Sequence, residues 1–186
     1  MQKKDVLFMT QAAAIAALYV VLTVVAAGFD LASGMIQVRF SEALCVLPFF
    51  TAAAVPGVTI GCLIANIVTG CMLPDVIFGT LATAIAAIAS WYLRKNRFLV
   101  AIPPIVSNAV IIPFVLTYAY KIPGGIPLQM LTVGAGELIS CMIFGQILLS
   151  ALYPFRLHIF NASTDKGAPV HEDAKESEQE PEQVTE

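Results

Sequence analysis

Long runs of apolar residues fill the chain from residue 10 to residue 153, and short polar or turn-forming breaks divide them. We predict six helices from this pattern, over residues 10–28, 41–54, 57–72, 76–93, 101–119 and 128–153. Five are long enough to approach the ~30 Å hydrocarbon core of a bilayer, whereas the second covers only about 21 Å. The pattern predicts an all-α membrane protein, a six-helix transmembrane bundle with a short second helix.

The positions of Lys and Arg predict the orientation of this bundle, because cytoplasmic loops carry an excess of these residues. With the N-terminus inside, the inner segments contain Lys3, Lys4, Arg94, Lys95, Arg97 and Arg156. The outer segments then contain only Arg39 and Lys121. We therefore expect both termini to be cytoplasmic.

Composition supports this fold class and divides the chain into three regions. Hydrophobic residues make up 58% of the chain and charged residues 12%, about half the charged fraction of a soluble domain. Beyond residue 160 the chain becomes acidic and has no aromatic residue, which is typical of a segment that cannot bury a core. We predict a cytoplasmic N-terminus over 1–9, a transmembrane substrate-binding domain over 10–155 and an acidic disordered cytoplasmic tail over 156–186.

Few charged residues interrupt the apolar segments, and each is a candidate functional residue because ionised groups are costly in hydrocarbon. Glu137 is the strongest candidate, since it lies roughly 13 Å from the outer end of the last predicted helix. No Lys or Arg lies within one helical turn of it. A carboxylate at that depth must become protonated, bond to another helix or face a wet cavity. We predict a role in ligand binding, with a structural buried hydrogen bond as the alternative.

Other polar residues extend this candidate site. Arg39 and Glu42 are three residues apart, so they share a helix face as a structural ion pair or as ligand contacts. Asn66 and Asn108 are amides at intermediate depth that either join helices or bind a ligand. Asp75 begins the fourth predicted helix, where it complements the helix dipole or lines the site.

The chemistry of these side chains favours one kind of ligand. Carboxylates and amides with few cations suit a molecule that has several N–H donors. The ring of Phe78 could stack on a flat heterocycle, as could Phe40 and Tyr118.

Small residues in the first predicted helix mark a second kind of site. Two small-xxx-small pairs give this helix a flat face that lets another helix approach closely. They consist of Ala12, Ala13, Ala16 and Ala17. This face is either an internal helix contact or a docking surface for a separate subunit.

Several function classes are not expected. The chain has no GxxxxGK[ST] phosphate loop, and the predicted bundle has no Ser–His or Cys–His pair, so we expect neither an ATPase nor another enzyme. The histidines are His158 and His171, and the cysteines form no CxxC pair, so we expect no metal and no cofactor. No basic stripe with interleaved aromatic residues suggests nucleic-acid binding.

Several motifs resemble the queuosine-precursor transporter (QueT) family. The most specific are IQVRFSEAL at 36–44 and DVIFGTLAT at 75–83. Others are LPFFT at 47–51, AVPG at 54–57, GCLIAN at 61–66 and PPIVSNA at 103–109. The resemblance covers about residues 8–155 and leaves out the acidic tail.

This resemblance implies the substrate-binding S component of an energy-coupling factor (ECF) transporter in the bacterial cytoplasmic membrane. Such a protein binds a small molecule from outside and joins a module of one transmembrane coupling protein and two ATPases. The implied cargo is a 7-deazaguanine precursor of queuosine or the base queuine, and the implied docking surface is the alanine face of the first helix.

A guanine-like edge presents adjacent N–H donors that one carboxylate accepts as a pair. We therefore predict that Glu137 binds the base edge, assisted by Asn108 and Asn66. Arg39, Glu42 and Asp75 would shape or gate the entrance. Two alternatives remain, namely an S component for another vitamin and a stand-alone secondary transporter in which Glu137 carries a proton.

Overall fold

The computed structural model describes residues 3–29 and 39–160 of the chain. These residues form α1 (Lys3–Gly28), η1 (Phe40–Phe49), α2 (Ala54–Val68), α3 (Leu73–Leu93), η2 (Leu99–Ala101), α4 (Ile102–Tyr118), α5 (Ile126–Glu137), η3 (Leu138–Phe144), α6 (Gly145–Leu152), η4 (Tyr153–Phe155) and α7 (Arg156–Ile159). Within these ranges the protein contains helices and no strand. The prediction of an all-α protein is confirmed, and every predicted helix has a helical counterpart.

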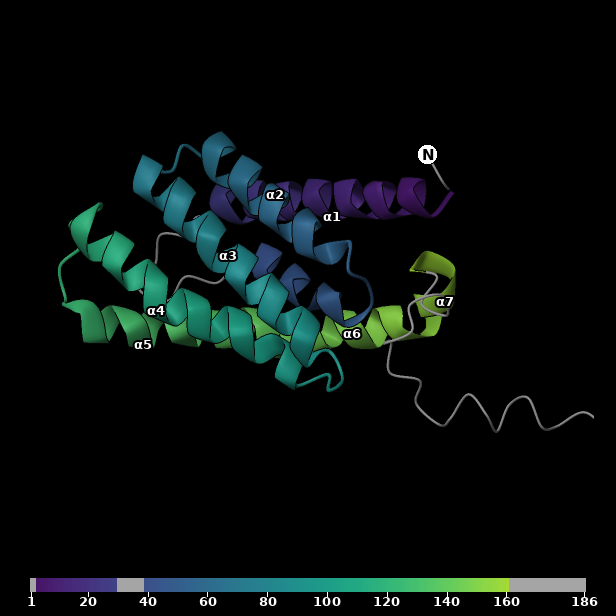
Figure 1. Ribbon diagram of the computed structural model, residues 1–186. Helices are drawn as coiled ribbons and strands as arrows, with labels where there is room; N and C mark the ends of the chain where they lie inside the picture. The colour runs from purple at the N-terminus through teal and green to yellow at the C-terminus, as the bar shows by residue number, and fades with distance from the viewer. Residues whose placement is uncertain (1–2, 30–38, 161–186) are drawn as a thin grey trace, which may run out of the picture.

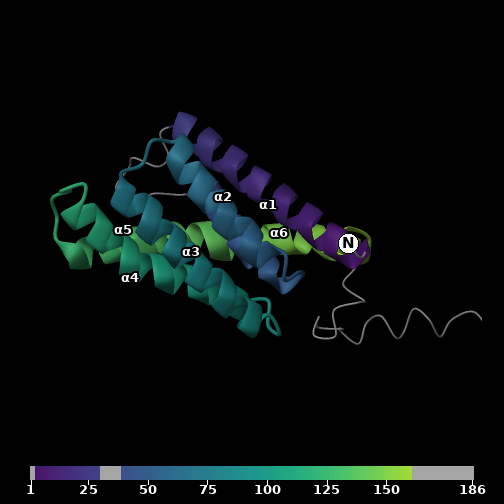
Figure 2. The same cartoon turned by 45° about the horizontal axis from the view of Figure 1, so that its top comes forward.

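The helices from α1 to α5 pack as a meander in which each long helix contacts the next one, and η1 lies inside (Figures 1 and 2). η1 contacts α1, α2, α3, α6 and η3, so it forms the centre of the bundle. Every residue from Ser41 to Phe49 is buried. The N-terminal turn of α1 and the last helix, α7, lie at one end, where Gln11 Nε2 donates a hydrogen bond to Ile159 O at 2.9 Å.

Two helices differ in type from the prediction. The second is a 3₁₀ helix of ten residues, so it covers about 20 Å at ~2.0 Å per residue. This length is close to that of the longer α-helix predicted over 41–54. The sixth predicted helix is continuous but contains a π-helical segment, η3, between α5 and α6. Hydrophobic patterns do not distinguish these helix types because all three bury an apolar face.

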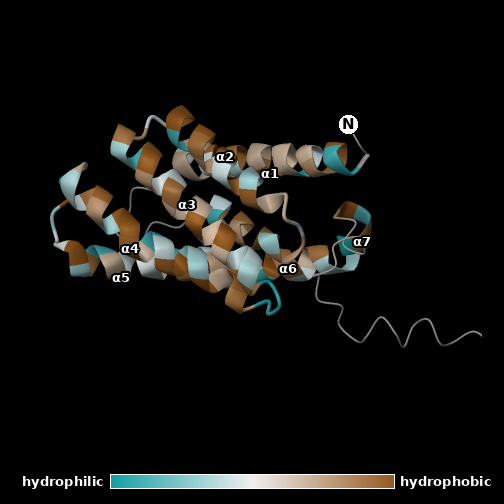
Figure 3. Ribbon diagram, in the orientation of Figure 1, coloured by the Kyte–Doolittle hydropathy of each residue, from teal (hydrophilic) through white to brown (hydrophobic). Residues whose placement is uncertain are grey.

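The length and apolarity of the helices are those of a multi-pass membrane protein. Among the described residues, four helical segments are long and apolar enough to cross a bilayer, namely Lys4–Gly28, Leu73–Leu93, Leu99–Tyr118 and Ile126–Ile159. η1 and α2 are apolar but shorter. Apolar residues dominate the ribbon in Figure 3, and hydrophilic residues gather at the first turn of α1 and at the connection between α3 and α4.

Close packing between α1 and α2 depends on two glycines. A Cβ atom on Gly57 would lie 3.0 Å from Ala12 O, and one on Gly61 would lie 3.0 Å from Ala16 Cα. Ala12 is half-buried and Ala16 is buried. Ala12 and Ala16 therefore make the internal helix contact that was one of the two interpretations of the four-alanine face, because α2 packs on their side of α1.

Ala13 and Ala17, one position further along the helix, are exposed. A step of one residue turns the side chain by about 100°, which places this pair on the outer side of α1. Ala13 and Ala17 are thus the most accessible of the four alanines.

The fold extends past the predicted end of the transmembrane domain at residue 155. α7 follows, and the ring of Phe160 stacks on that of Phe50 with centroids 5.0 Å apart. The predicted tail beyond residue 160 and most of the predicted loop at 29–37 lie outside the described residues.

We expect Gly61→Ala to destabilise the protein by about 1–3 kcal/mol, as overpacking of a tight contact does. The added Cβ would lie 2.7 Å from Tyr19 Cβ, so the α1 and α2 backbones would have to separate. Thermal unfolding in detergent measures this loss. Gly28→Ala is the matched control because nothing lies within 4 Å of its Cβ position, and equal losses for both variants would contradict this packing account.

Candidate ligand-binding site

A cavity of about 380 Å³ lies at the end of the bundle where α1 ends and where the α2–α3 and α4–α5 connections lie. Its volume falls within the range of about 300–1,000 Å³ for small-molecule sites. The lining residues come from α1, η1, α2, α3, α4 and the connections between helices: Tyr19, Thr23, Ala26, Ala27, Arg39, Ser41, Asn66, Thr69, Cys71, Asp75, Leu116, Tyr120 and Ile122. It brings together three of the predicted site residues, Arg39, Asn66 and Asp75.

One carboxylate oxygen of Asp75 accepts a hydrogen bond, and the other has no hydrogen-bond partner. It lies in the first turn of α3, just after Pro74, where the helix dipole favours a negative charge. Oδ2 accepts a hydrogen bond from Tyr120 Oη at 3.0 Å, and Tyr120 Oη accepts one from the Met72 backbone N–H at 3.1 Å. Oδ1 is buried and has no hydrogen-bond partner. An acceptor left unpaired in an apolar interior is costly unless a ligand supplies a donor.

Two other polar side chains that line the cavity, Asn66 and Ser41, also have donors or acceptors without a strong hydrogen-bond partner. Asn66 is buried, and its Nδ2 donates only to the weak acceptor Cys62 Sγ, at 3.5 Å. A Cβ on Gly79 would lie 3.3 Å from both Asn66 Nδ2 and Asp75 Oδ1, so the amide and the carboxylate both border a position that has no side chain. The buried Ser41 Oγ also has no partner.

The cavity contains both signs of charge. Arg39 immediately precedes η1 and is half-buried. Its guanidinium can only donate hydrogen bonds, whereas an ionised Asp75 can only accept them. The cavity therefore presents donors, acceptors and an amide to one molecule, which is the chemistry of a polar heterocycle binder.

Tyr120 stays protonated at neutral pH and holds Asp75 in place. Burial raises the pKa of its phenol to about 12, and the nearby Asp75 carboxylate adds to this rise. The phenol thus remains a donor across the physiological range and keeps Oδ2 occupied, while Oδ1 is buried without a partner.

Glu137 and Glu42 are buried in separate hydrogen-bonded pairs and do not line this cavity. Glu137 Oε1 accepts from Asn108 Nδ2 at 2.9 Å, and its Oε2 accepts from Cys141 Sγ at 3.6 Å. Asn108 precedes the cavity residue Leu116 by eight positions, which places this pair about 12 Å deeper along α4.

Glu42 has a partner on each carboxylate oxygen. Its Oε1 accepts from Tyr19 Oη at 2.5 Å, and its Oε2 accepts from Cys45 Sγ at 3.1 Å. Cys141, within η3, also lies 3.4 Å from Glu42 O, so it connects the Glu42 and Glu137 clusters. The π-helical segment begins directly after Glu137, and such segments are frequent at functional sites.

Phe78 lies apart from this cavity. Its side chain is 48% exposed and lines a separate apolar groove between α3 and α4, together with Phe114 and Tyr118. The sequence also gave no indication of Tyr120 or Ser41, because a tyrosine in a connection and a serine at a helix start are common and carry no spacing signal.

A multi-pass helical bundle with a polar cavity at one end has the architecture of a membrane protein that handles a small molecule. A family model described as QueT transporter matches residues 9–154. The chain belongs to the QueT transporter family, so it is a transporter and not an enzyme. No curated protein and no solved structure matches the chain.

We expect Tyr120→Phe to destabilise the protein by about 1–3 kcal/mol, because it removes the donor to Asp75 and the acceptor for the Met72 N–H. Thermal unfolding in detergent measures the loss. Tyr118→Phe is the matched control, since Tyr118 is 73% exposed. A Tyr120 variant as stable as the control would contradict the proposed role of this hydroxyl.

Proposed function

We propose that this chain is the S component of an ECF-type importer and that it binds a 7-deazaguanine precursor of queuosine, or queuine, from outside the cell. The family match supports transport. The observation that carries the substrate proposal is the buried Asp75 Oδ1 without a partner in a cavity also lined by Asn66 and Arg39. A flat base with adjacent N–H donors would satisfy that oxygen.

The remaining contacts follow from the chemistry of such a base. Its ring amide N–H and exocyclic amine are donors for Asp75, and its carbonyl oxygen is an acceptor for Asn66 Nδ2 or for Arg39. An aminomethyl group on some precursors would carry a positive charge, which the carboxylate favours. Glu137 and Asn108 would fix α4 against α5 below the cavity, and Glu42 would hold η1 against α1 through Tyr19.

We expect Asp75→Asn to weaken binding of queuine by about ten- to hundredfold, because a hydrogen bond to a charged acceptor contributes ~1.5–3 kcal/mol. Isothermal titration of the purified protein measures this change. Glu137→Gln is the matched comparison, since its amide oxygen can still accept from Asn108 and its effect should be below about threefold.

A larger loss of queuine binding in Glu137→Gln than in Asp75→Asn would contradict the proposal that Asp75 binds the base. If Glu137→Gln abolished binding while Asp75→Asn left it unchanged, the base would bind at the deeper Glu137–Asn108 pair, as the sequence predicted. If neither variant changed queuine binding, the cargo would be another molecule, such as a different vitamin.

We further propose that the outer side of α1 docks on the coupling protein. Ala13 and Ala17 are exposed, and their small side chains let a second helix approach closely. They lie on a different side of α1 from the cavity residue Tyr19, which is buried, so docking and cargo binding would use different sides of the helix.

We expect Ala17→Trp to retain queuine binding and to lose most uptake in cells that contain the coupling module, because a bulky ring keeps the partner helix away. Uptake of labelled queuine measures this loss. Leu18→Trp is a matched control on the same turn, since Leu18 is already large and 53% exposed. Normal uptake by Ala17→Trp would contradict docking, and uptake by the unmodified protein in cells without the ATPases would favour a secondary transporter.

A further inference from the structure

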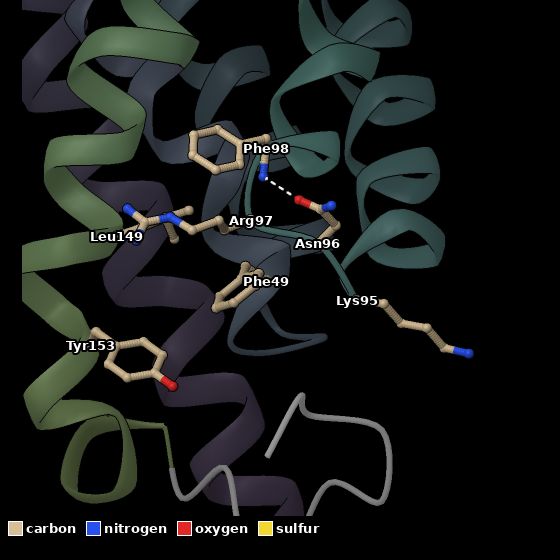
Figure 4. A pocket seen from close by; sticks show the side chains of 7 residues that line it. All are labelled: Phe49, Lys95, Asn96, Arg97, Phe98, Leu149 and Tyr153. Atoms are coloured by element: carbon tan, nitrogen blue, oxygen red, sulfur yellow. Dashed lines mark hydrogen bonds between the residues drawn. The ribbon is translucent and has the colours of Figure 1, made fainter. Parts of the chain in front are cut away.

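A second cavity, of about 540 Å³, lies at the other end of the bundle from the polar cavity, beside the connection between α3 and α4 (Figure 4). Its lining combines cations and donors with aromatic and aliphatic surface, and consists of Phe49, Lys95, Asn96, Arg97, Phe98, Leu149 and Tyr153. None of these residues is acidic. This cavity has no part in the proposed cargo site.

Two hydrogen bonds orient the Arg97 side chain at this cavity and leave other N–H donors of its guanidinium for a ligand. Its Nε donates to Gln146 Oε1 at 3.0 Å, and its Nη2 donates to Ser150 Oγ at 2.8 Å. Gln146 Nε2 in turn donates to Arg97 O at 2.6 Å. A guanidinium has five N–H donors, so three remain after these two bonds. α6 therefore positions a cation whose other donors can bind an anion.

Neighbouring residues add to this donor set. Asn96 Oδ1 accepts from the Phe98 backbone N–H at 2.9 Å, so the amide nitrogen of Asn96 is left as a donor (Figure 4). Lys95 extends outward from the rim on a flexible side chain that can turn toward a bound anion. Two cations and an amide within one short connection form a site for a phosphate.

The apolar part of the lining identifies the source of that phosphate. Phe49 and Leu149 are buried, whereas Phe98 is 55% exposed on the surface of an apolar bundle. A free phosphate has no apolar group to contact this aromatic and aliphatic surface, whereas a phospholipid has a glycerol group and acyl chains that can pack against it. Basic pockets between helices at a membrane boundary are known to bind acidic lipid headgroups.

We propose that this cavity binds the headgroup phosphate of an anionic phospholipid, with Arg97 and Lys95 as its cationic contacts and Phe98 against the lipid chain. Bound lipid would then link the α3–α4 connection to α6.

Native mass spectrometry of the full chain in detergent, titrated with phosphatidylglycerol or phosphatidylcholine, tests this proposal. We expect phosphatidylglycerol to bind more tightly, and Lys95→Gln and Arg97→Gln each to weaken its binding about fivefold, since a cation near the bilayer surface contributes about that factor. Lys121→Gln, an exposed lysine in the α4–α5 connection, should leave it unchanged. Queuine binding should be unaffected in Lys95→Gln, which separates this site from the cargo site.

Three outcomes would overturn the proposal. The first is equal binding of the two lipids. The second is the same loss of phosphatidylglycerol binding in Lys121→Gln as in Lys95→Gln, which would indicate a nonspecific charge effect. The third is inorganic phosphate displacing the lipid at equal concentration, which would make the site one for a free anion. Because Lys95 is exposed and has a side chain that bonds to no described residue, its variant tests the site even if Arg97→Gln fails to fold.

Discussion

Every polar group buried within an apolar helical bundle needs a hydrogen-bond partner, and this constraint organises the structure. Glu137 bonds to Asn108 and Cys141, and Glu42 bonds to Tyr19 and Cys45. Each pair joins two helices, so these carboxyl groups hold the centre of the bundle together. Asp75 follows the same rule on one oxygen only. Its other oxygen is buried and unpaired in a residue that lines the polar cavity, and we therefore propose that the cargo binds there.

The same constraint explains why the sequence predicted the fold better than the site. Helix positions follow from runs of apolar residues, which are local, so each of the six predicted helices has a counterpart that differs only in type or ends. The short α7 lies in the segment predicted to be a tail and was not predicted. The state of a carboxylate depends on residues far away in the chain. Glu137 was predicted to bind the ligand because no cation lies near it in sequence. Its hydrogen-bond partner, Asn108, is 29 positions away in the chain. Asp75 is held by Tyr120, 45 positions away, and no local pattern indicates that contact.

The small residues of α1 predict a close helix contact, but only the packing shows which side of the helix makes it. The alanine pairs predicted a close helix contact, and α2 makes that contact on the side of Ala12 and Ala16 through Gly57 and Gly61. The other pair, Ala13 and Ala17, is exposed on a different side of α1. A sequence cannot assign the two sides because neighbouring alanines have the same size and hydrophobicity.

A structure of the protein purified together with its cargo tests the central claim most directly. We predict a flat deazapurine in the cavity between α2, α3 and Arg39, with a ring or amine nitrogen about 3 Å from Asp75 Oδ1. Tyr120 should keep its bond to Oδ2. A base bound against Glu137 with its Asn108 bond broken, or an Asp75 Oδ1 that has no ligand donor in the loaded protein, would contradict the account.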